Sequence, residues 1–216
     1  MPHIRLPFPR AGLYAITREN YPNEQALADA VAAAIRGGAV AVQYRAKASR
    51  DPLREAAKLL AVCRESGVPL IINDDVELAR CVEADGVHVG KDDQSLAEAR
   101  GVLGPAAIIG VSCYDSVELA VQAEANGASY AAFGRFFPSK TKPDAPCARL
   151  ETLAEAKRRV SIPIAAIGGV TPENGGLLVD AGADFLAVIE AVFGGADPEP
   201  AASDFLPLFN RKRKGE

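Results

Sequence analysis

The sequence predicts a single (β/α)8-barrel domain, also called a TIM barrel, and three observations favour this fold. Short apolar runs alternate with longer segments of helical periodicity along the chain. Four of the runs are entered through similar residues, which indicates a repeated βα unit. The first run is followed by Arg18-Glu-Asn-Tyr-Pro22, whereas a doubly wound sheet, the main alternative, should show a glycine fingerprint there.

Eight strands and the helices between them follow from this alternation. The expected strands are Leu13–Thr17, Val40–Tyr44, Leu70–Asn73, Gly86–Val89, Ile108–Ser112, Tyr130–Phe133, Ile164–Ile167 and Phe185–Ile189. The expected helices are Glu24–Arg36, Pro52–Ser66, Val76–Glu83, Leu96–Leu103, Val117–Asn126, Leu150–Val160 and Glu173–Ala181, with a last helix within Pro200–Phe209. The repeated strand entries are Gly38-Ala39-Val40, Ala84-Asp85-Gly86-Val87, Gly127-Ala128-Ser129-Tyr130 and Gly182-Ala183-Asp184-Phe185. Glycines at such places can end a helix in the left-handed conformation.

Composition narrows the class of protein. A formal net charge of −4 argues against a general nucleic-acid binder. No apolar run approaches the roughly 20 residues that span a bilayer, and the proline-rich start is unlike a signal peptide. The four cysteines are far apart, as in reduced cytosolic proteins. We therefore expect a cytoplasmic barrel spanning residues 1–216, with flexible ends at 1–10 and 211–216, and small-molecule partners. A homo-oligomer is compatible with the sequence.

Residues that directly follow the strands of a barrel converge on one face, which carries the active site. Arg45 and Lys47 alternate along an extended segment after the second strand, so both can point toward one anion. The other interpretation of this pair is two solvated surface charges. An arginine can contact a phosphate through two nitrogen atoms and a lysine supplies a mobile charge, but the Gln-x-Arg-x-Lys spacing alone does not decide between these interpretations.

Two aspartates on neighbouring loops could hold a metal ion. Asp74 follows the third strand and Asp93 the fourth, and ionised carboxylates with phosphate oxygens suit Mg2+. Either aspartate could instead cap a helix, a role that suits Asp75 better because Val76 follows it.

Three further features complete the expected active face. Gly168-Gly169 allows close approach of a ligand to the backbone, and Thr171-Pro172 starts a helix; a plain tight turn is the alternative. The loop from Gly134 to Pro146 is polar and long enough to be a lid. His88 lies inside a strand, where a supporting role is favoured over acid–base catalysis.

Together these residues resemble the thiamine phosphate synthase family over nearly the whole chain. The pieces that carry the resemblance are Gly12-Leu-Tyr-Ala-Ile-Thr17, Gln43-Tyr-Arg-Ala-Lys47, Ile72-Asn-Asp74, Gly86-Val-His-Val-Gly90 with Asp93, Gly110-Val-Ser112, Phe137-Pro-Ser-Lys-Thr-Lys142 and Ala166-Ile-Gly-Gly169. The resemblance implies a transferase that condenses 4-amino-5-hydroxymethyl-2-methylpyrimidine diphosphate with thiazole phosphate, or with its carboxylated tautomer. The products would be thiamine phosphate and diphosphate.

The resemblance also implies roles for individual residues. Those that would hold the pyrimidine diphosphate are Gln43, Arg45, Lys47, Asn73, Ser112 and Lys142, of which Lys142, Ser112, Arg45 and Lys47 would be catalytic. Those that would hold the thiazole phosphate are Ser139, Thr141, Gly169, Ile189 and Glu190. Asp74 and Asp93 would hold Mg2+.

Three positions depart from the family pattern, and two other functions stay open. Ser139 stands where threonine is common, Lys91 where glutamine is common, and Glu190 where serine is expected. The carboxylate of Glu190 would lie beside a phosphate pocket, which favours only its backbone facing the ligand. The alternatives are a thiazole tautomerase, which needs neither the aspartate pair nor the Arg45–Lys47 pair, and an inactive phosphate-binding barrel.

Overall fold

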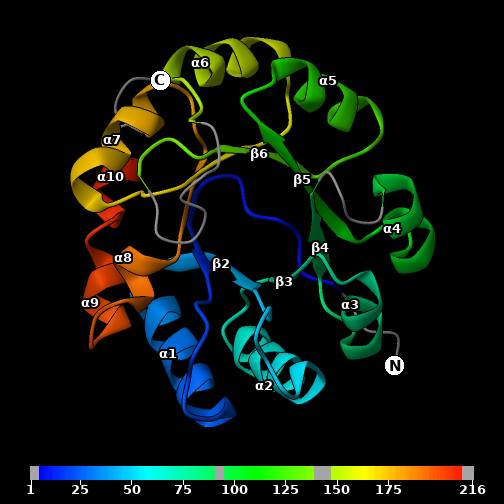
Figure 1. The fold of residues 1–216 in the computed structure, drawn as a ribbon, viewed down its shortest axis with the longest axis vertical. Helices are drawn as coiled ribbons and strands as arrows, with labels where there is room; N and C mark the ends of the chain where they lie inside the picture. The colour runs from blue at the N-terminus through cyan, green and yellow to red at the C-terminus, as the bar shows by residue number, and fades with distance from the viewer. Residues whose placement is uncertain (1–4, 91–94, 139–146, 211–216) are drawn as a thin grey trace.

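The computed structural model describes residues 5–90, 95–138 and 147–210, and within them eight parallel strands close into a barrel. The strands are β1 (Gly12–Ile16), β2 (Ala39–Tyr44), β3 (Leu70–Asn73), β4 (Gly86–Val89), β5 (Ile108–Tyr114), β6 (Tyr130–Gly134), β7 (Ile164–Ile167) and β8 (Phe185–Val188). Each strand pairs with the next in sequence, and β8 pairs with β1. Figure 1 shows the helices arranged as a ring around these strands, so the predicted fold class is confirmed.

The helices begin and end close to the predicted bounds. They are α1 (Glu24–Arg36), α2 (Pro52–Glu65), α3 (Val76–Val82), α4 (Leu96–Leu103), α5 (Val117–Ala125), α6 (Leu150–Arg159), α7 (Pro172–Asp180), α8 (Glu190–Phe193), α9 (Pro198–Ser203) and α10 (Leu206–Asn210). The single last helix expected within Pro200–Phe209 was wrong, because α9 and α10 are separate. Pro207 explains the break, since its ring would collide with the carbonyl group of Ser203 in a continuous helix.

The repeated strand entries have a common physical basis. At three of them, a side chain just before an even-numbered strand accepts a hydrogen bond from a backbone N–H at the start of the preceding odd-numbered strand. The acceptors are Asp85, Ser129 and Asp184, and the donors are the N–H groups of Leu70, Ile109 and Ile164, at 2.9, 3.0 and 3.0 Å. Leu70 and Ile164 are the first residues of their strands and Ile109 is the second, and each buried N–H group needs a partner. The repeated entries therefore link the amino ends of neighbouring strands by side-chain hydrogen bonds.

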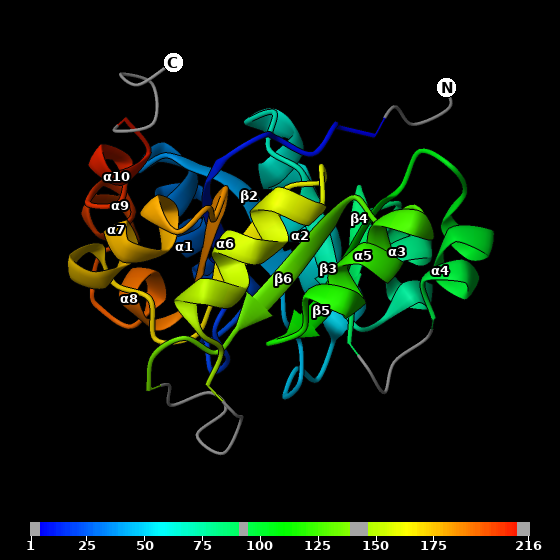
Figure 2. The same cartoon turned by 90° about the horizontal axis from the view of Figure 1, so that it is seen from above.

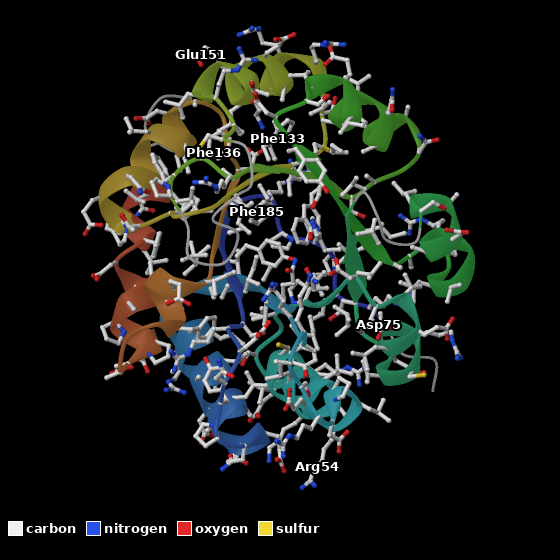
Figure 3. All side chains as sticks on the ribbon, in the orientation of Figure 1. Arg54, Asp75, Phe133, Phe136, Glu151 and Phe185 are labelled. Carbon is white, nitrogen blue, oxygen red and sulfur yellow. The ribbon has the colours of Figure 1, made fainter. Side chains whose placement is uncertain are left out.

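The apolar core has two layers. The larger layer fills the space between the outside of the barrel and the helices, and it includes Phe133. The smaller layer lies inside the barrel, where Phe185 packs with Tyr14 and Tyr130. Figure 3 shows Phe185 within the ring of strands, whereas Arg54 and Glu151 project outward from α2 and α6. The inner layer leaves the carboxyl ends of the strands open to form a cavity.

Residues 5–10 were expected to belong to a flexible end, and for this segment the expectation was wrong. The segment crosses the face of the barrel opposite to the strand arrowheads, as Figure 2 shows in dark blue. Leu6 N donates to the buried Asp85 carboxylate at 2.8 Å. Phe8 stacks on Tyr130 with ring centroids 4.4 Å apart. The aromatic contact buries apolar surface that an open barrel floor would expose, which is what orders the segment.

The four cysteines are free thiols, as expected. Among the described helices, none combines the length and apolar character that crossing a bilayer would require.

Candidate active site

A cavity of about 730 Å3 lies at the carboxyl ends of the strands. Nine of the residues predicted for the site line it: Gln43, Arg45, Lys47, Asn73, Asp74, Ser112, Gly169, Ile189 and Glu190. The other four predicted residues, Asp93, Ser139, Thr141 and Lys142, lie outside the described residues. Every predicted site residue that the structure describes is therefore brought to one cavity.

The two cations after β2 are held differently. Arg45 is mostly buried, and its Nη1 lies 2.9 Å from Glu19 Oε1. Its backbone N–H also donates to Thr17 Oγ1 at 3.0 Å. Lys47 is half exposed, and its Nζ lies 3.8 Å from Asp74 Oδ2. Arg45 thus presents an oriented guanidinium group, whereas Lys47 presents a charge on a more mobile stem.

The two aspartates after β3 have separate tasks. Asp75 caps α3 by accepting the N–H of Leu78 at 2.8 Å, which confirms the capping role expected for it. Asp74 adopts a positive φ of 64° and turns its carboxylate toward the cavity wall. Asn73 Nδ2 donates to its Oδ2 at 2.6 Å. The amide of Asn73 therefore orients the Asp74 carboxylate at the cavity.

Asp74 has the chemistry of a ligand for a hard cation such as Mg2+. Mg2+ commonly takes only one or two carboxylates from a protein and completes its shell with water and substrate phosphates. Asp74 offers one carboxylate, oriented by the Asn73 amide and 3.8 Å from the Lys47 ammonium group. No group of three or more His, Cys, Asp or Glu that could hold a metal occurs among residues 5–90, 95–138 and 147–210.

The turn after β7 packs closely against the segment after β6 and leaves no room for a side chain at Gly169. Gly169 has a φ of +63°, and a Cβ atom there would lie 2.3 Å from the carbonyl oxygen of Pro138. Its own carbonyl accepts from Asn174 Nδ2 at 2.9 Å, which ties the turn to the start of α7. Thr171 and Asn174 form a capping box, as expected for a helix that starts at Pro172.

Glu190 lies at the start of the short helix α8, with Ile189 as the residue before it. Its side chain is exposed. Burial raises the pKa of the nearby Tyr21, Arg18 opposes this increase, and the negative charge of Glu190 adds to it. Arg18 stacks over the Tyr21 ring at 5.4 Å from the centroid. Glu190 and Arg18 therefore both lie close enough to Tyr21 to affect the pKa of its hydroxyl, with opposite signs.

Three residues that the sequence analysis did not assign to the site also line the cavity. Tyr14 forms part of the cavity floor, and Arg135 and Tyr114 follow β6 and end β5. The alternation of inward-pointing residues along β1 could have identified Tyr14. Arg135 could have been found as the charged residue directly after β6. His88 also lines the cavity, as a residue that bridges Ser112 and Tyr130.

Comparison with known proteins identifies the family. The model of the thiamine monophosphate synthase family matches residues 13–192. The chain belongs to this family. The chain is 54% identical to a thiamine-phosphate synthase of Methylococcus capsulatus, over 97% of this chain and 94% of that protein. It is 50% identical to one of Thiobacillus denitrificans, over 92% and 94%.

A solved structure gives the same family assignment. Thiamine phosphate pyrophosphorylase from Pyrococcus furiosus superposes with a TM-score of 0.84 at 33% identity, covering 94% of this chain and 96% of that one. The family, the fold and the enzyme class expected from the sequence are thereby confirmed. The chain is a transferase of thiamine biosynthesis that acts on small molecules.

Proposed function

We propose that the chain condenses 4-amino-5-hydroxymethyl-2-methylpyrimidine diphosphate with thiazole phosphate by a dissociative, Mg2+-assisted route. The observation that carries this proposal is the convergence of Arg45, Lys47 and Asp74 on one wall of the cavity. An anion-binding pair beside a carboxylate is what a metal-bound diphosphate needs.

The pyrimidine diphosphate would bind along the ends of β2, β3 and β5. Gln43, Asn73 and Ser112 would orient the pyrimidine, while Arg45 and Lys47 contact the diphosphate. The Glu19–Arg45 pair holds the guanidinium fork ready for a bidentate contact. Lys47, now near Asp74, would turn to the phosphate oxygens when the metal occupies Asp74.

Asp74 would hold Mg2+, together with Asp93, which lies outside the described residues. When bound, the ion would supply positive charge next to the oxygens on which negative charge grows as the carbon–oxygen bond breaks. Arg45 and Lys47 would act on the same charge, and Lys142 is expected to join them. Fixed cations in a cavity sheltered from water stabilise such charge more strongly than they would in solution.

The site needs no strong base for this chemistry. Bond cleavage would leave a pyrimidine-stabilised carbocation, and the thiazole nitrogen would capture it directly. Burial raises the pKa of the Tyr14 hydroxyl, so this floor residue stays protonated at neutral pH. The main tasks of the protein are therefore to neutralise the departing diphosphate and to hold the two reactants in contact.

The thiazole phosphate would bind at the ends of β7 and β8. Gly169 would admit the phosphate close to the backbone, and the N–H groups of Ile189 and Glu190 would face it, with Ser139 and Thr141 expected to contribute hydroxyl groups. Barrels often bind phosphate with the loops after these two strands. The two substrates would then meet above Tyr14.

A product assay with both substrates tests the proposal. Purified protein with Mg2+ should release thiamine phosphate and diphosphate in equal amounts, EDTA should stop the reaction, and added Mg2+ should restore it. Turnover that persists in EDTA would contradict the role of Asp74. Conversion of a carboxylated thiazole phosphate to its tautomer, without use of the pyrimidine substrate, would indicate the tautomerase instead. Binding of thiazole phosphate without any product would indicate the inactive barrel.

A further inference from the structure

Five polar side chains form a continuous hydrogen-bond chain through the inner layer of the barrel. Gln43 Nε2 donates to the Tyr14 hydroxyl at 2.9 Å. The hydroxyl groups of Tyr14 and Tyr130 are 2.9 Å apart. His88 Nδ1 lies 3.0 Å from the Tyr130 hydroxyl, and His88 Nε2 lies 2.9 Å from Ser112 Oγ. The chain therefore begins and ends at cavity-lining residues, and of its five members only Tyr130 does not line the cavity.

Counting hydrogens leaves three ways to satisfy all four links with a neutral imidazole. An amide nitrogen can only donate, so the first link uses a hydrogen of Gln43. Each tyrosine has one hydroxyl hydrogen, and burial raises the pKa of both phenols, so both hydrogens stay in place. Every group can donate toward Ser112, or Ser112, His88 and Tyr130 can all donate back toward Tyr14. In the third arrangement, Tyr14 and His88 both donate to Tyr130, and Ser112 donates to His88.

The three arrangements leave the surplus hydrogen at different places. In the first, the Ser112 hydroxyl keeps a hydrogen for an acceptor in the cavity. In the second and third, the hydroxyl of Tyr14 or of Tyr130 accepts two hydrogen bonds and must find an acceptor for its own hydrogen. Tyr14 is only 1% exposed and Tyr130 is fully buried, whereas Ser112 is partly exposed and can donate to water when no ligand is bound. An unsatisfied buried hydroxyl is costly, so the surplus hydrogen belongs at Ser112.

We propose that this hydrogen-bond chain has one fixed direction and that Tyr14, Tyr130 and His88 are positioning residues for the Ser112 hydroxyl. His88 is then the neutral tautomer with hydrogen on Nε2, and it accepts from Tyr130 at Nδ1. The Ser112 oxygen accepts from His88, so its hydrogen points to an acceptor on the bound pyrimidine diphosphate. This inference rests on the proposed function for the identity of that ligand.

The direction has a consequence for the reaction. A hydroxyl that already accepts a hydrogen bond is a stronger donor, because successive bonds in a chain polarise one another. A donor held in place before the substrate arrives also loses little freedom when negative charge grows on the leaving group. Tyr130 should therefore affect turnover although it does not line the cavity.

The tautomer of His88 can be measured in the ligand-free protein. The sequence contains two histidines, His3 and His88, so labelling with 15N-histidine gives ring-nitrogen signals from two imidazoles. The signals that remain in the His3→Gln variant belong to His88. At about pH 8, where a histidine with an ordinary pKa near 6.5 is neutral, we expect hydrogen on Nε2 and none on Nδ1. Hydrogen on Nδ1, a mixture of tautomers, or a doubly protonated ring would overturn the proposal. This measurement needs no turnover, so it remains decisive even if the proposed function fails.

A double-mutant cycle tests the functional part. Tyr130→Phe should lower kcat by about threefold to tenfold, the value of one hydrogen bond. In a Ser112→Ala background the same change should lower kcat by less than about twofold, because Tyr130 acts through Ser112. If Tyr130→Phe lowers kcat as much with Ala at position 112 as with Ser, Tyr130 does not act through Ser112, and the proposal is overturned.

Tyr44→Phe is the matched control for this cycle. Tyr44 is also a buried phenol, and its hydroxyl donates to Glu55, away from the hydrogen-bond chain. Its effect on kcat should be small and the same with Ser112 or Ala at position 112. Thermal unfolding of all variants shows whether the two tyrosine changes alter stability equally.

Discussion

Lys47 Nζ lies 3.8 Å from Asp74 Oδ2 at the wall of the cavity, so a cation proposed to bind the diphosphate and a carboxylate proposed to bind the metal neutralise each other. This pairing keeps both side chains near the places where a metal-bound diphosphate would need them. The pair is partly exposed, so its own contribution to stability is small. A metal–diphosphate complex can therefore separate Lys47 from Asp74 at little cost.

Asp74→Asn should lower kcat by about a hundredfold or more, because the departing diphosphate then loses much of its charge neutralisation. The concentration of Mg2+ needed for half-maximal rate should also rise. Asp75→Asn is the matched control, since it alters the adjacent carboxylate but keeps a side chain that can cap α3. Its kcat should stay within a few-fold of the parent. Equal losses in the two variants would contradict a metal role specific to Asp74.

Arg45→Lys should raise the KM for the pyrimidine diphosphate by about tenfold, because lysine keeps the charge but loses the bidentate fork and its pairing with Glu19. Arg54→Lys is the control. Arg54 also pairs with a glutamate, Glu24, but on the outer surface of α2, as Figure 3 shows for Arg54. Steady-state kinetics should show no change for Arg54→Lys beyond twofold. An unchanged KM for Arg45→Lys would remove the bidentate contact from the proposal.

Gly169→Ala should raise the KM for thiazole phosphate as well as lower the stability of the fold. Gly67 has nearly the same backbone conformation, with a φ of +66°, but nothing lies within 4 Å of a Cβ atom placed there. Gly67→Ala and Gly169→Ala should therefore share a conformational cost of roughly 1–2 kcal/mol in stability. Only Gly169→Ala adds an overlap, 2.3 Å from the Pro138 carbonyl oxygen, and only it should raise the KM for thiazole phosphate by tenfold or more. Unchanged kinetics in Gly169→Ala would show that the turn does not approach the ligand.

The sequence predicted the barrel and the members of the cavity wall because both depend on local pattern. Residues that directly follow parallel strands share one face, so reading those positions brought Arg45, Lys47 and Asp74 together without knowledge of any contact. The hydrogen-bond chain could not be predicted from local pattern, because it joins Tyr14 to Tyr130, 116 residues away in the sequence. The two tyrosines occupy inward-facing positions of different strands. No local periodicity encodes which inward-facing residues meet.

The packing of residues 5–10 was also missed, for a related reason. Prolines and polar residues near a chain end favour an extended, solvated segment, and only the open floor of the barrel supplies a surface for Phe8. Tertiary contact overrode local preference at this segment. The break between α9 and α10, by contrast, was readable from Pro207, which the periodicity alone did not weigh.

Phe8→Ala tests whether this floor contact stabilises the barrel. Phe8 is partly buried and contacts Tyr130 and Phe185 at centroid distances of 4.4 and 4.8 Å. Phe8→Ala should lower the free energy of unfolding by about 2 kcal/mol, less than the ~3–5 kcal/mol expected when a fully buried phenylalanine is replaced by alanine. This change should lower the Tm by about 4–8 °C. Phe8→Leu should recover part of this loss. An unchanged Tm for Phe8→Ala would mean that the segment does not stay on the barrel floor in solution.

Glu190 is the residue that fits the proposed phosphate pocket least well by charge, and its replacement tests how the pocket is arranged. At ~4 Å from a phosphate charge, a carboxylate would cost roughly 4 kcal/mol per charge pair at an effective dielectric of 20, or several-hundredfold in binding. The exposed side chain of Glu190 can turn to solvent, so we expect the carboxylate to avoid this cost. Glu190→Ser should therefore leave the KM for thiazole phosphate within a few-fold of the parent. Glu173→Ser, a change of the same charge at an exposed position of the first turn of α7, is the control for altered net charge. A KM for thiazole phosphate that falls a hundredfold or more in Glu190→Ser alone would show that the carboxylate repels the phosphate. This result would favour the inactive phosphate-binding barrel over the synthase.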